Sequence, residues 1–225
     1  MSIAVALALG FIPTLIWLAF FLREDIYPEP RRLIVKAFIF GGLSAFFALL
    51  LEILLKPLLE KIVFTLPRLA EENLSVFTGF GIVEEVVKFF FIYLLVRRSP
   101  YFDEPIDAMV YMVTGALGFA TVENLFLVFS ANPESIFSTI LFRFVGANLL
   151  HALSSAIVGH YWARGIRFNL EGKLIFAGLV LASLFHIIFN YLVFKFSDFL
   201  VYPIAFLAIL GFFVLYDFEE LKKVA

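Results

Sequence analysis

The chain is divided into apolar runs, each about long enough to cross a lipid bilayer. A membrane-spanning helix needs roughly 20 mostly apolar residues, and seven stretches of this 225-residue chain have that length. Helices and closed barrels alone satisfy their backbone polar groups in lipid, and the sequence has no alternating barrel pattern. We therefore predict an all-α, polytopic transmembrane helix bundle of about seven or eight helices. The expected spans are residues 2–22, 34–55, 74–96, 106–129, 137–162, 173–195 and 199–216.

The composition supports a single integral-membrane domain over residues 1–225. Hydrophobic residues make up 63% of the chain, against about 45–50% in soluble domains. The net charge of -2 gives no reason to expect a nucleic-acid partner. The absence of cysteine excludes disulfides, thiolate metal sites and a cysteine nucleophile. The first run lacks the charged start and cleavage site of a signal peptide, so we expect a retained span.

The connectors predict how the chain lies in the membrane. Ten Lys and Arg residues fall in connectors one, three and five and the tail, and four fall in the other connectors. Because cytoplasmic connectors carry the excess of positive charge, we expect the N-terminus outside and the C-terminus in the cytoplasm. We expect an integral membrane protein. Residues 56–73 mix charged and apolar side chains, which is typical of a short interfacial helix.

Three charged residues interrupt the third run. Glu84 and Glu85 are adjacent, and Lys88 follows within "EEVVK". A charge at mid-bilayer costs at least ~2.5–3.5 kcal/mol on insertion scales, so such residues are kept for pairing or for function. Glu84 and Lys88 are four residues apart and can pair on one helical turn. This pairing would leave Glu85 unexplained, and two adjacent carboxylates at low dielectric suit a general acid or base.

Polar residues in three later runs are candidate partners of these glutamates. Glu123 lies in the fourth run, His151 in the fifth and His186 in the sixth. A hydrogen bond to a neighbouring helix would explain any one of them. With ~1.5 Å per residue along a helix, however, all of them lie at similar depths, from the midplane outward. This convergence predicts one buried site with catalytic residues Glu84, Glu85, Glu123, His151, His186 and Asn190, supported by Lys88.

Other polar residues of the runs are interpreted as structural. Arg143 is expected to be a pairing or interfacial residue, and Glu52 to be interfacial. His160 is expected at the surface, at the cytoplasmic end of the fifth run. Gly115 and Gly118 predict a close approach between two helices in the membrane.

Two hydrolytic chemistries and one transport chemistry fit the predicted site. In a metal version, two histidines and a glutamate bind zinc and a second glutamate is the base. In a metal-free version, a glutamate activates water, and His186 and Asn190 donate hydrogen bonds to the oxyanion. A proton- or ion-coupled carrier also uses buried Glu and His, although no repeat or broken span is evident. The possible metal ligands are Glu84, Glu123, His151 and His186.

The order of motifs along residues 24–190 resembles that of the PrsW family of intramembrane proteases. The wider superfamily of that family includes the CAAX prenyl endopeptidases and bacteriocin-immunity proteins. "EEVVK" is similar to the E-E-x-x-K signature of the family. The other similar stretches are "DIYPEP" (25–30), "DAMVYMVTGALGFATVEN" (107–124), "HALSSAIVG" (151–159) and "HIIFN" (186–190).

The resemblance implies an intramembrane endopeptidase of a prokaryotic cell membrane that cuts membrane-anchored protein substrates such as anti-sigma factors. Glu84 matches the leading catalytic candidate of the superfamily, Glu85 its supporting partner and Glu123 a glutamate specific to PrsW proteins. His151, His186 and Asn190 match the later motifs. Zinc is the implied cofactor, with no cofactor as the alternative. A catalytically silent, immunity-type membrane protein is the remaining alternative to an enzyme.

Overall fold

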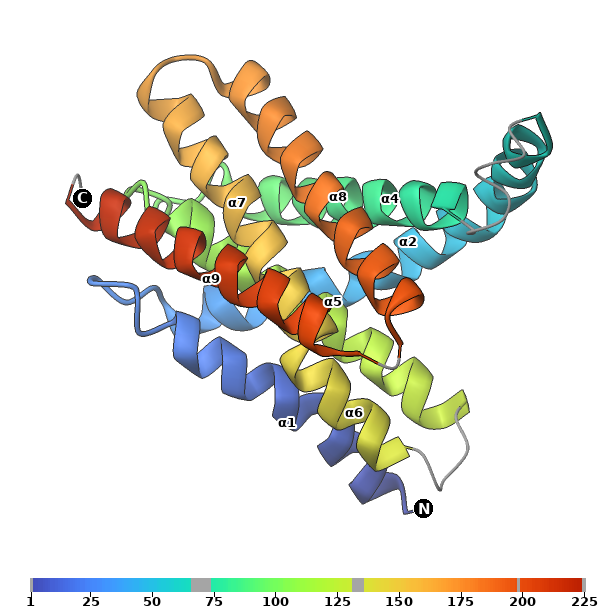
Figure 1. The fold of residues 1–225 in the computed structure, drawn as a ribbon. Helices are drawn as coiled ribbons and strands as arrows, with labels where there is room; N and C mark the ends of the chain where they lie inside the picture. Colours follow the sequence, from blue (N-terminus) through green and yellow to red (C-terminus); the bar gives the residue numbers. More distant parts are fainter. Residues whose placement is uncertain (1, 66–73, 131–135, 198, 224–225) are drawn as a thin grey trace.

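The computed structural model describes residues 2–65, 74–130, 136–197 and 199–223, which form α-helices and no strand (Figure 1). The all-α bundle predicted from the sequence is confirmed. In chain order the helices are α1 (Ile3–Phe21), α2 (Arg31–Thr65), α4 (Leu74–Val96), α5 (Asp107–Ser130), α6 (Ile136–Val145), α7 (Ala147–Arg167), α8 (Glu171–Lys195) and α9 (Val201–Lys222).

Six segments of the described residues are long and apolar enough to cross a membrane. They are α1, most of α2, α5, the α6–α7 pair, α8 and α9. Helix α4 has 23 residues but is absent from this set, because "EEVVK" places three charges in its middle. A helix of this length still matches the bilayer thickness, and its charged residues are buried against other helices.

The fifth predicted span is broken, which corrects the expectation of a continuous helix. Helices α6 and α7 meet at Gly146, whose backbone angles of φ -108° and ψ -98° lie outside the helical region. A Cβ atom at this position would lie 2.8 Å from the carbonyl oxygen of Phe142. Glycine therefore permits a break that a larger residue would obstruct.

The separate interfacial helix expected within residues 56–73 is wrong for its first part. Residues 56–65 continue α2 as far as Thr65. The rest of that expected helix, residues 66–73, lies outside the described residues.

Helix α5 lies at the centre of the bundle and packs against α2, α7 and α1. Its glycines bring it close to α2, as the sequence predicts. A Cβ atom on Gly118 would lie 2.8 Å from the carbonyl carbon of Phe38, and one on Gly115 would meet the side chain of Ile92 in α4. Gly115 also lies against the backbone of Gly41 in α2. Close backbone contact of this kind is a common basis of helix packing in lipid.

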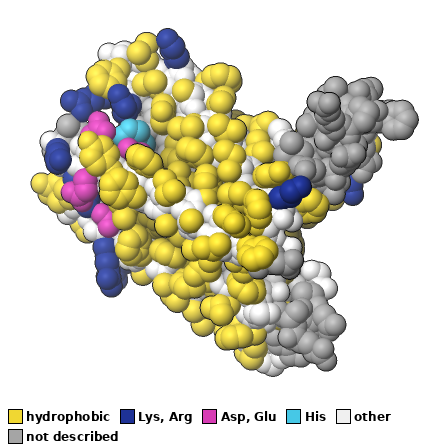
Figure 2. All heavy atoms as spheres, viewed as in Figure 1, with side chains coloured by type: hydrophobic (Ala, Val, Ile, Leu, Met, Phe, Trp, Pro, Cys, Tyr) yellow, Lys and Arg dark blue, Asp and Glu magenta, His cyan; other side chains and the backbone are white. Residues whose placement is uncertain are grey.

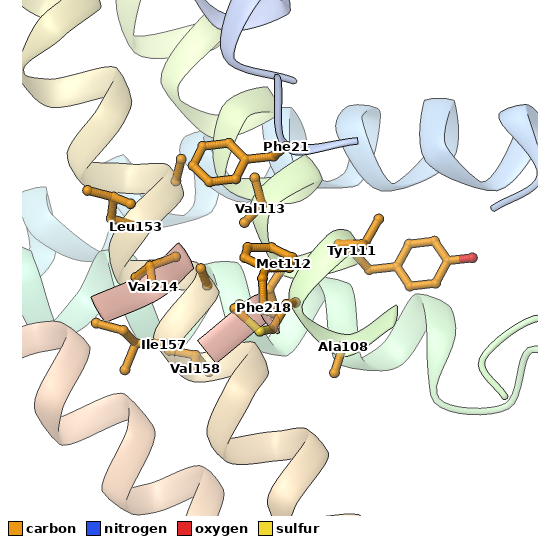
Figure 3. Close-up of a cluster of buried hydrophobic side chains, with 14 of the residues drawn as sticks. Phe21, Ala108, Tyr111, Met112, Val113, Leu153, Ile157, Val158, Val214 and Phe218 are labelled. Atoms are coloured by element: carbon orange, nitrogen blue, oxygen red, sulfur yellow. The ribbon is translucent and has the colours of Figure 1, made fainter. Parts of the chain in front are cut away.

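The hydrophobic core joins α1, α5, α7 and α9. Figure 3 shows Phe21, Met112, Leu153, Val214 and Phe218 packed together, one or more from each of these helices. Apolar side chains also cover most of the face in Figure 2, whereas charged side chains gather at the end where the C-terminus lies. An apolar periphery of this extent is expected where lipid, not water, is the surrounding solvent.

The "DIYPEP" connector is fixed by its own acidic side chains. The Asp25 carboxylate accepts hydrogen bonds from the backbone N–H groups of Tyr27 at 3.2 Å and Glu29 at 3.1 Å. Glu29 in turn accepts a hydrogen bond from the Tyr111 hydroxyl of α5. Burial, together with the Asp107 carboxylate, raises the pKa of Glu29 to about 8. The connector thereby joins the start of α2 to the start of α5.

Candidate active site

Four helices bring the predicted site residues together. Helix α4 carries Glu84 and Glu85, α5 carries Glu123, α7 carries His151 and α8 carries His186. All except the half-buried Glu123 are buried. Residues separated by up to about 100 positions in the chain are thus in contact, as the similar depths of the polar residues predicted.

Glu85 is held by donors from three helices. Lys88 Nζ donates to Glu85 Oε1 at 2.6 Å, and His186 Nδ1 donates to the same oxygen at 2.8 Å. The hydroxyls of Ser154 and Ser155 donate to Glu85 at 2.9 and 3.5 Å. Glu85 and Lys88 are both 0% exposed. This arrangement suits a carboxylate that is fixed in place.

The alternative in which Lys88 pairs with Glu84 is therefore not the arrangement that the structure shows. Residues three apart and residues four apart are both neighbours on a helix, so Lys88 could reach either glutamate. Lys88 pairs with Glu85, three residues earlier, and its Nζ also lies 5.1 Å from the centre of the Phe119 ring. Ser154 and Ser155 of α7 and His186 of α8 also donate hydrogen bonds to Glu85. Glu84 lies outside this set of hydrogen bonds.

Glu84 faces the two histidines without a hydrogen bond to either. Its buried Oε2 has no hydrogen-bond partner among the described residues. That oxygen lies 3.8 Å from His151 Nδ1 and 3.6 Å from His186 Nε2. One ligand atom from each of the three residues lies within 4.8 Å of the others. Tetrahedral zinc with bonds of about 2.0–2.2 Å separates its ligand atoms by roughly 3.3 Å, so a small closure would fit a metal.

A carboxylate supports each histidine on its other ring nitrogen. His186 Nδ1 donates to Glu85, and His151 Nε2 donates to Glu123 at 2.8 Å. A carboxylate accepts only, so these bonds fix the tautomers and leave one nitrogen of each ring with a lone pair. This carboxylate–histidine arrangement is typical of metal sites. Lys88 Nζ lies 3.1 Å from the free His151 Nδ1, so an ammonium group competes for that nitrogen.

Glu123 lies behind His151 and outside the three-residue ligand group. Arg143 Nη2 donates to Glu123 Oε2 at 2.8 Å, and Arg143 Nε donates to Asn124 Oδ1 at 2.6 Å. The expectation that Arg143 is a pairing residue is confirmed. The geometry gives Glu123 a supporting position behind His151, and does not favour it as a direct ligand.

The structure changes the interpretation of two other residues. Glu52 is half-buried and close enough to Glu84 and Glu123 to interact electrostatically with both. The signal in the sequence that could have identified Glu52 is that it is a single glutamate within an apolar run. His160 is only 3% exposed, with its Nε2 3.9 Å from Asp217 of α9, so the predicted surface position is wrong. Helix α9 packs over this part of α7 and removes His160 from the surface.

A cavity of about 540 Å³ lies beside this site. Glu84 lines it, and so does Asn190 of α8, which is one turn after His186. The break between α6 and α7 contributes Gly146 and Ala147 to its wall. A reactive carboxylate, an amide side chain and a broken helix therefore meet at one space large enough for part of a peptide.

A buried cluster of Glu and His that could hold a metal, enclosed by membrane-length helices, is a site suited to hydrolysis inside the bilayer. The family model described as "PrsW family intramembrane metalloprotease" matches residues 29–216. The chain thus belongs to the PrsW family of intramembrane metalloproteases, which are hydrolases. Together with its bacterial relatives, this makes it an integral protein of the prokaryotic membrane.

Proteins named Protease PrsW from three bacteria are among its similar relatives. The protein from Geobacillus kaustophilus is 31% identical over 145 residues, which are 64% of this chain and 59% of the relative. The Bacillus subtilis protein is 27% identical over 225 residues, covering 96% of this chain and 94% of the relative. The Oceanobacillus iheyensis protein is 28% identical over 218 residues, 96% of each. No solved structure gives a significant match to the chain.

Proposed function

We propose that this chain is an intramembrane endopeptidase in which Glu84, His151 and His186 hold a zinc ion. Its substrates would be membrane-anchored proteins of the anti-sigma-factor kind. The main support is the position of Glu84 Oε2, which faces one nitrogen of each histidine at 3.8 and 3.6 Å and makes no hydrogen bond to any residue that the structure describes. Zinc, when bound, supplies Lewis-acid activation of water and of the scissile carbonyl.

The carboxylates of the site have different tasks in this proposal. Glu85 orients His186 and is a poor proton acceptor, because four donors already occupy its two oxygens. Glu123 orients His151 and is itself held by Arg143. Glu84 is the carboxylate left to act on water, as a ligand of the metal or as the base. Asn190 lines the same cavity and is a candidate donor to the oxyanion.

A metal-free mechanism is the second candidate, and one contact favours it. Lys88 Nζ donates to His151 Nδ1 at 3.1 Å, which uses the nitrogen that a metal would need. In that case Glu84 would be the general base, and the oxyanion would accept hydrogen bonds from Asn190 and from a His186 ring that carries a proton on both nitrogens, one of them held by Glu85. The two mechanisms share the reaction and differ in bound metal.

Metal content separates the two mechanisms without a known substrate. The protein would be purified in detergent without chelator, and bound metal measured by mass spectrometry. We expect near-stoichiometric zinc in the wild type and its loss in His151→Ala and His186→Ala. His160→Ala tests for zinc bound elsewhere, because His160 lies outside this cluster in a second group, with Asp217 and Glu220, that could hold a metal. It should leave the zinc of the Glu84 cluster bound. No metal after zinc is added back would favour the glutamate mechanism.

Cleavage of a single-span reporter in lipid vesicles tests the enzyme itself. We expect Glu84→Ala to abolish cleavage while the helical fold, followed by circular dichroism, is kept. A carrier or a silent immunity-type protein would leave the reporter intact even with wild-type chain. Cleavage by Glu84→Ala at the wild-type rate would contradict the role given to Glu84.

A further inference from the structure

The cavity beside Glu84 is mostly apolar. Its wall comes from α4, from both sides of the α6–α7 break, from α8 and from the start of α9. Glu84, Arg143 and Asn190 are among the polar residues that reach it. The apolar lining includes Phe80, Phe142, Phe189, Val193, Leu200 and Ile204.

The cavity reaches the lipid-facing side of the bundle. Several of its lining residues have large exposed fractions, and three examples are Phe142 at 53%, Ile204 at 46% and Val193 at 38%. They come from α6, α9 and α8, and exposed apolar side chains of this kind face hydrocarbon in a membrane protein. A molecule can therefore reach Glu84 from the bilayer, between the α6–α7 break and the α8–α9 hairpin.

The break at Gly146 keeps this space open. A Cβ atom there would lie 3.4 Å from Phe189 Cζ, a ring that also lines the cavity. A longer side chain at this position would project toward the same ring. If α6 and α7 formed one continuous helix, the wall of the cavity would have no gap at this position.

The size of the cavity limits what it can hold. A helix with a diameter of about 10 Å and a rise of 1.5 Å per residue would fill a volume of 540 Å³ with roughly one turn. The cavity therefore holds about one turn of a transmembrane helix and not its whole length. A short unwound segment with one or two apolar side chains fits.

We propose that this cavity binds a large apolar side chain that flanks the scissile bond of a substrate entering sideways from the bilayer. The inference rests on the proposed function and adds a specificity-determining surface to it. Glu84 is shared between the cavity and the ligand group, so a residue bound in the cavity lies next to the reacting carbonyl. Val193 and Phe142 contribute to the surface that selects this residue.

Binding can be tested apart from cleavage because the chain has no cysteine. Val193→Cys would be introduced into the Glu84→Ala protein, and disulfide formation with single-cysteine, single-span peptides would be measured in lipid vesicles. The control is Val180→Cys, on the same helix and 52% exposed but away from the cavity. We expect cross-links at Val193→Cys to peptides with leucine or phenylalanine beside the cysteine, and few at Val180→Cys. Equal cross-linking at both positions would overturn the proposal.

Specificity is tested by narrowing the cavity. Cleavage would be measured for reporters that carry alanine, leucine or phenylalanine at each position near the outer end of the span. The cleaved peptide bond would be identified by mass spectrometry. We expect the wild type to favour leucine or phenylalanine over alanine by about tenfold or more on one side of the bond. Val193→Trp should lower the ratio of leucine or phenylalanine cleavage to alanine cleavage toward one, while Val180→Trp, away from the cavity, should leave that ratio at the wild-type value.

The outcomes distinguish this proposal from the proposed function. If the wild type cuts reporters of all three kinds equally well, or if Val193→Trp behaves as Val180→Trp, the cavity does not select the substrate. If the wild type cuts no reporter but the cross-links at Val193→Cys form, the chain binds apolar segments in the cavity and the proposal that it is an endopeptidase is wrong. If neither cleavage nor cross-linking is seen, both proposals are rejected.

Discussion

The Glu85–Lys88 pair gives a quantitative test of how the site is stabilised. Both side chains are 0% exposed, and Lys88 Nζ lies 2.6 Å from Glu85 Oε1. Removing one partner of a buried ion pair leaves an uncompensated charge and costs about 3–5 kcal/mol. Glu85→Gln keeps the size of the side chain, so no cavity contributes. We expect it to lower the free energy of unfolding by that amount.

The double variant Glu85→Gln/Lys88→Met is expected to recover most of this loss. It removes both charges, and replacing a whole buried ion pair with uncharged groups is often neutral. Lys88→Met alone should be as damaging as Glu85→Gln alone, because it leaves the carboxylate without its counter-ion. The double-mutant cycle should therefore give a coupling energy of about 3 kcal/mol or more, well above the ~0.5 kcal/mol of independent sites.

The assay is reversible unfolding in mixed detergent micelles, followed by circular dichroism, for the wild type and the three variants. Glu219 and Lys222 of α9 provide the matched control, because they have the same three-residue spacing but Glu219 is solvent-exposed. The cycle for that pair should show much weaker coupling, since exposed ion pairs contribute little. Additive effects of Glu85→Gln and Lys88→Met would refute the view that this pair neutralises the charge of the site.

Three further predictions follow from other parts of the molecule. Gly118→Val should disrupt the packing of α2 against α5 and destabilise the fold by about 1–3 kcal/mol or more in the same unfolding assay. Gly172→Ala is the control and should be neutral, because nothing lies within 4 Å of its added Cβ. Burial, with nearby carboxylates, raises the pKa of Glu29 from 4.5 to about 8, so the folded chain binds this proton more tightly than the unfolded chain does. This contribution to stability is complete below about pH 4.5 and is lost as the pH rises toward 8. The thermal midpoint of the wild type should therefore fall over that pH range, and the midpoint of Glu29→Gln should fall less. Equal slopes of thermal midpoint against pH in the two proteins would contradict this. Arg143→Lys should slow reporter cleavage by about tenfold, because lysine cannot make both hydrogen bonds of the guanidinium group. A wild-type cleavage rate in this variant would show that cleavage does not depend on how Arg143 orients Glu123.

Length and hydropathy were sufficient to predict six of the seven spans, because the bilayer sets the length of a helix independently of its neighbours. The third predicted span, α4, has the length but three charges, so hydropathy alone does not identify it. The depth of each polar residue then follows from the helical rise, which is why the meeting of Glu84, Glu123, His151 and His186 could be predicted. The partner of Lys88 could not. Spacings of three and four residues are both allowed within one helix, and donors on α7 and α8 decide between them.

Two other features depend on packing that the local sequence does not show. The break at Gly146 lies in an apolar run with no proline, and it is defined by backbone angles that glycine tolerates. His160 is polar and near a span end, which is typical of a surface residue. Its burial results from α9, more than 40 residues later in the chain.

The charges of α4 lead to an expectation about how the chain enters the membrane during synthesis. The partners of Glu85 include Ser154 of α7 and His186 of α8, which leave the ribosome long after α4 does. Until then α4 contains three charges with only Lys88 as an internal counter-ion. We expect α4 to enter the lipid poorly alone and to remain beside the insertion machinery until α8 has been made. The proteolytic site would then be completed at one of the last steps of biogenesis, so incomplete chains would not cut neighbouring membrane proteins.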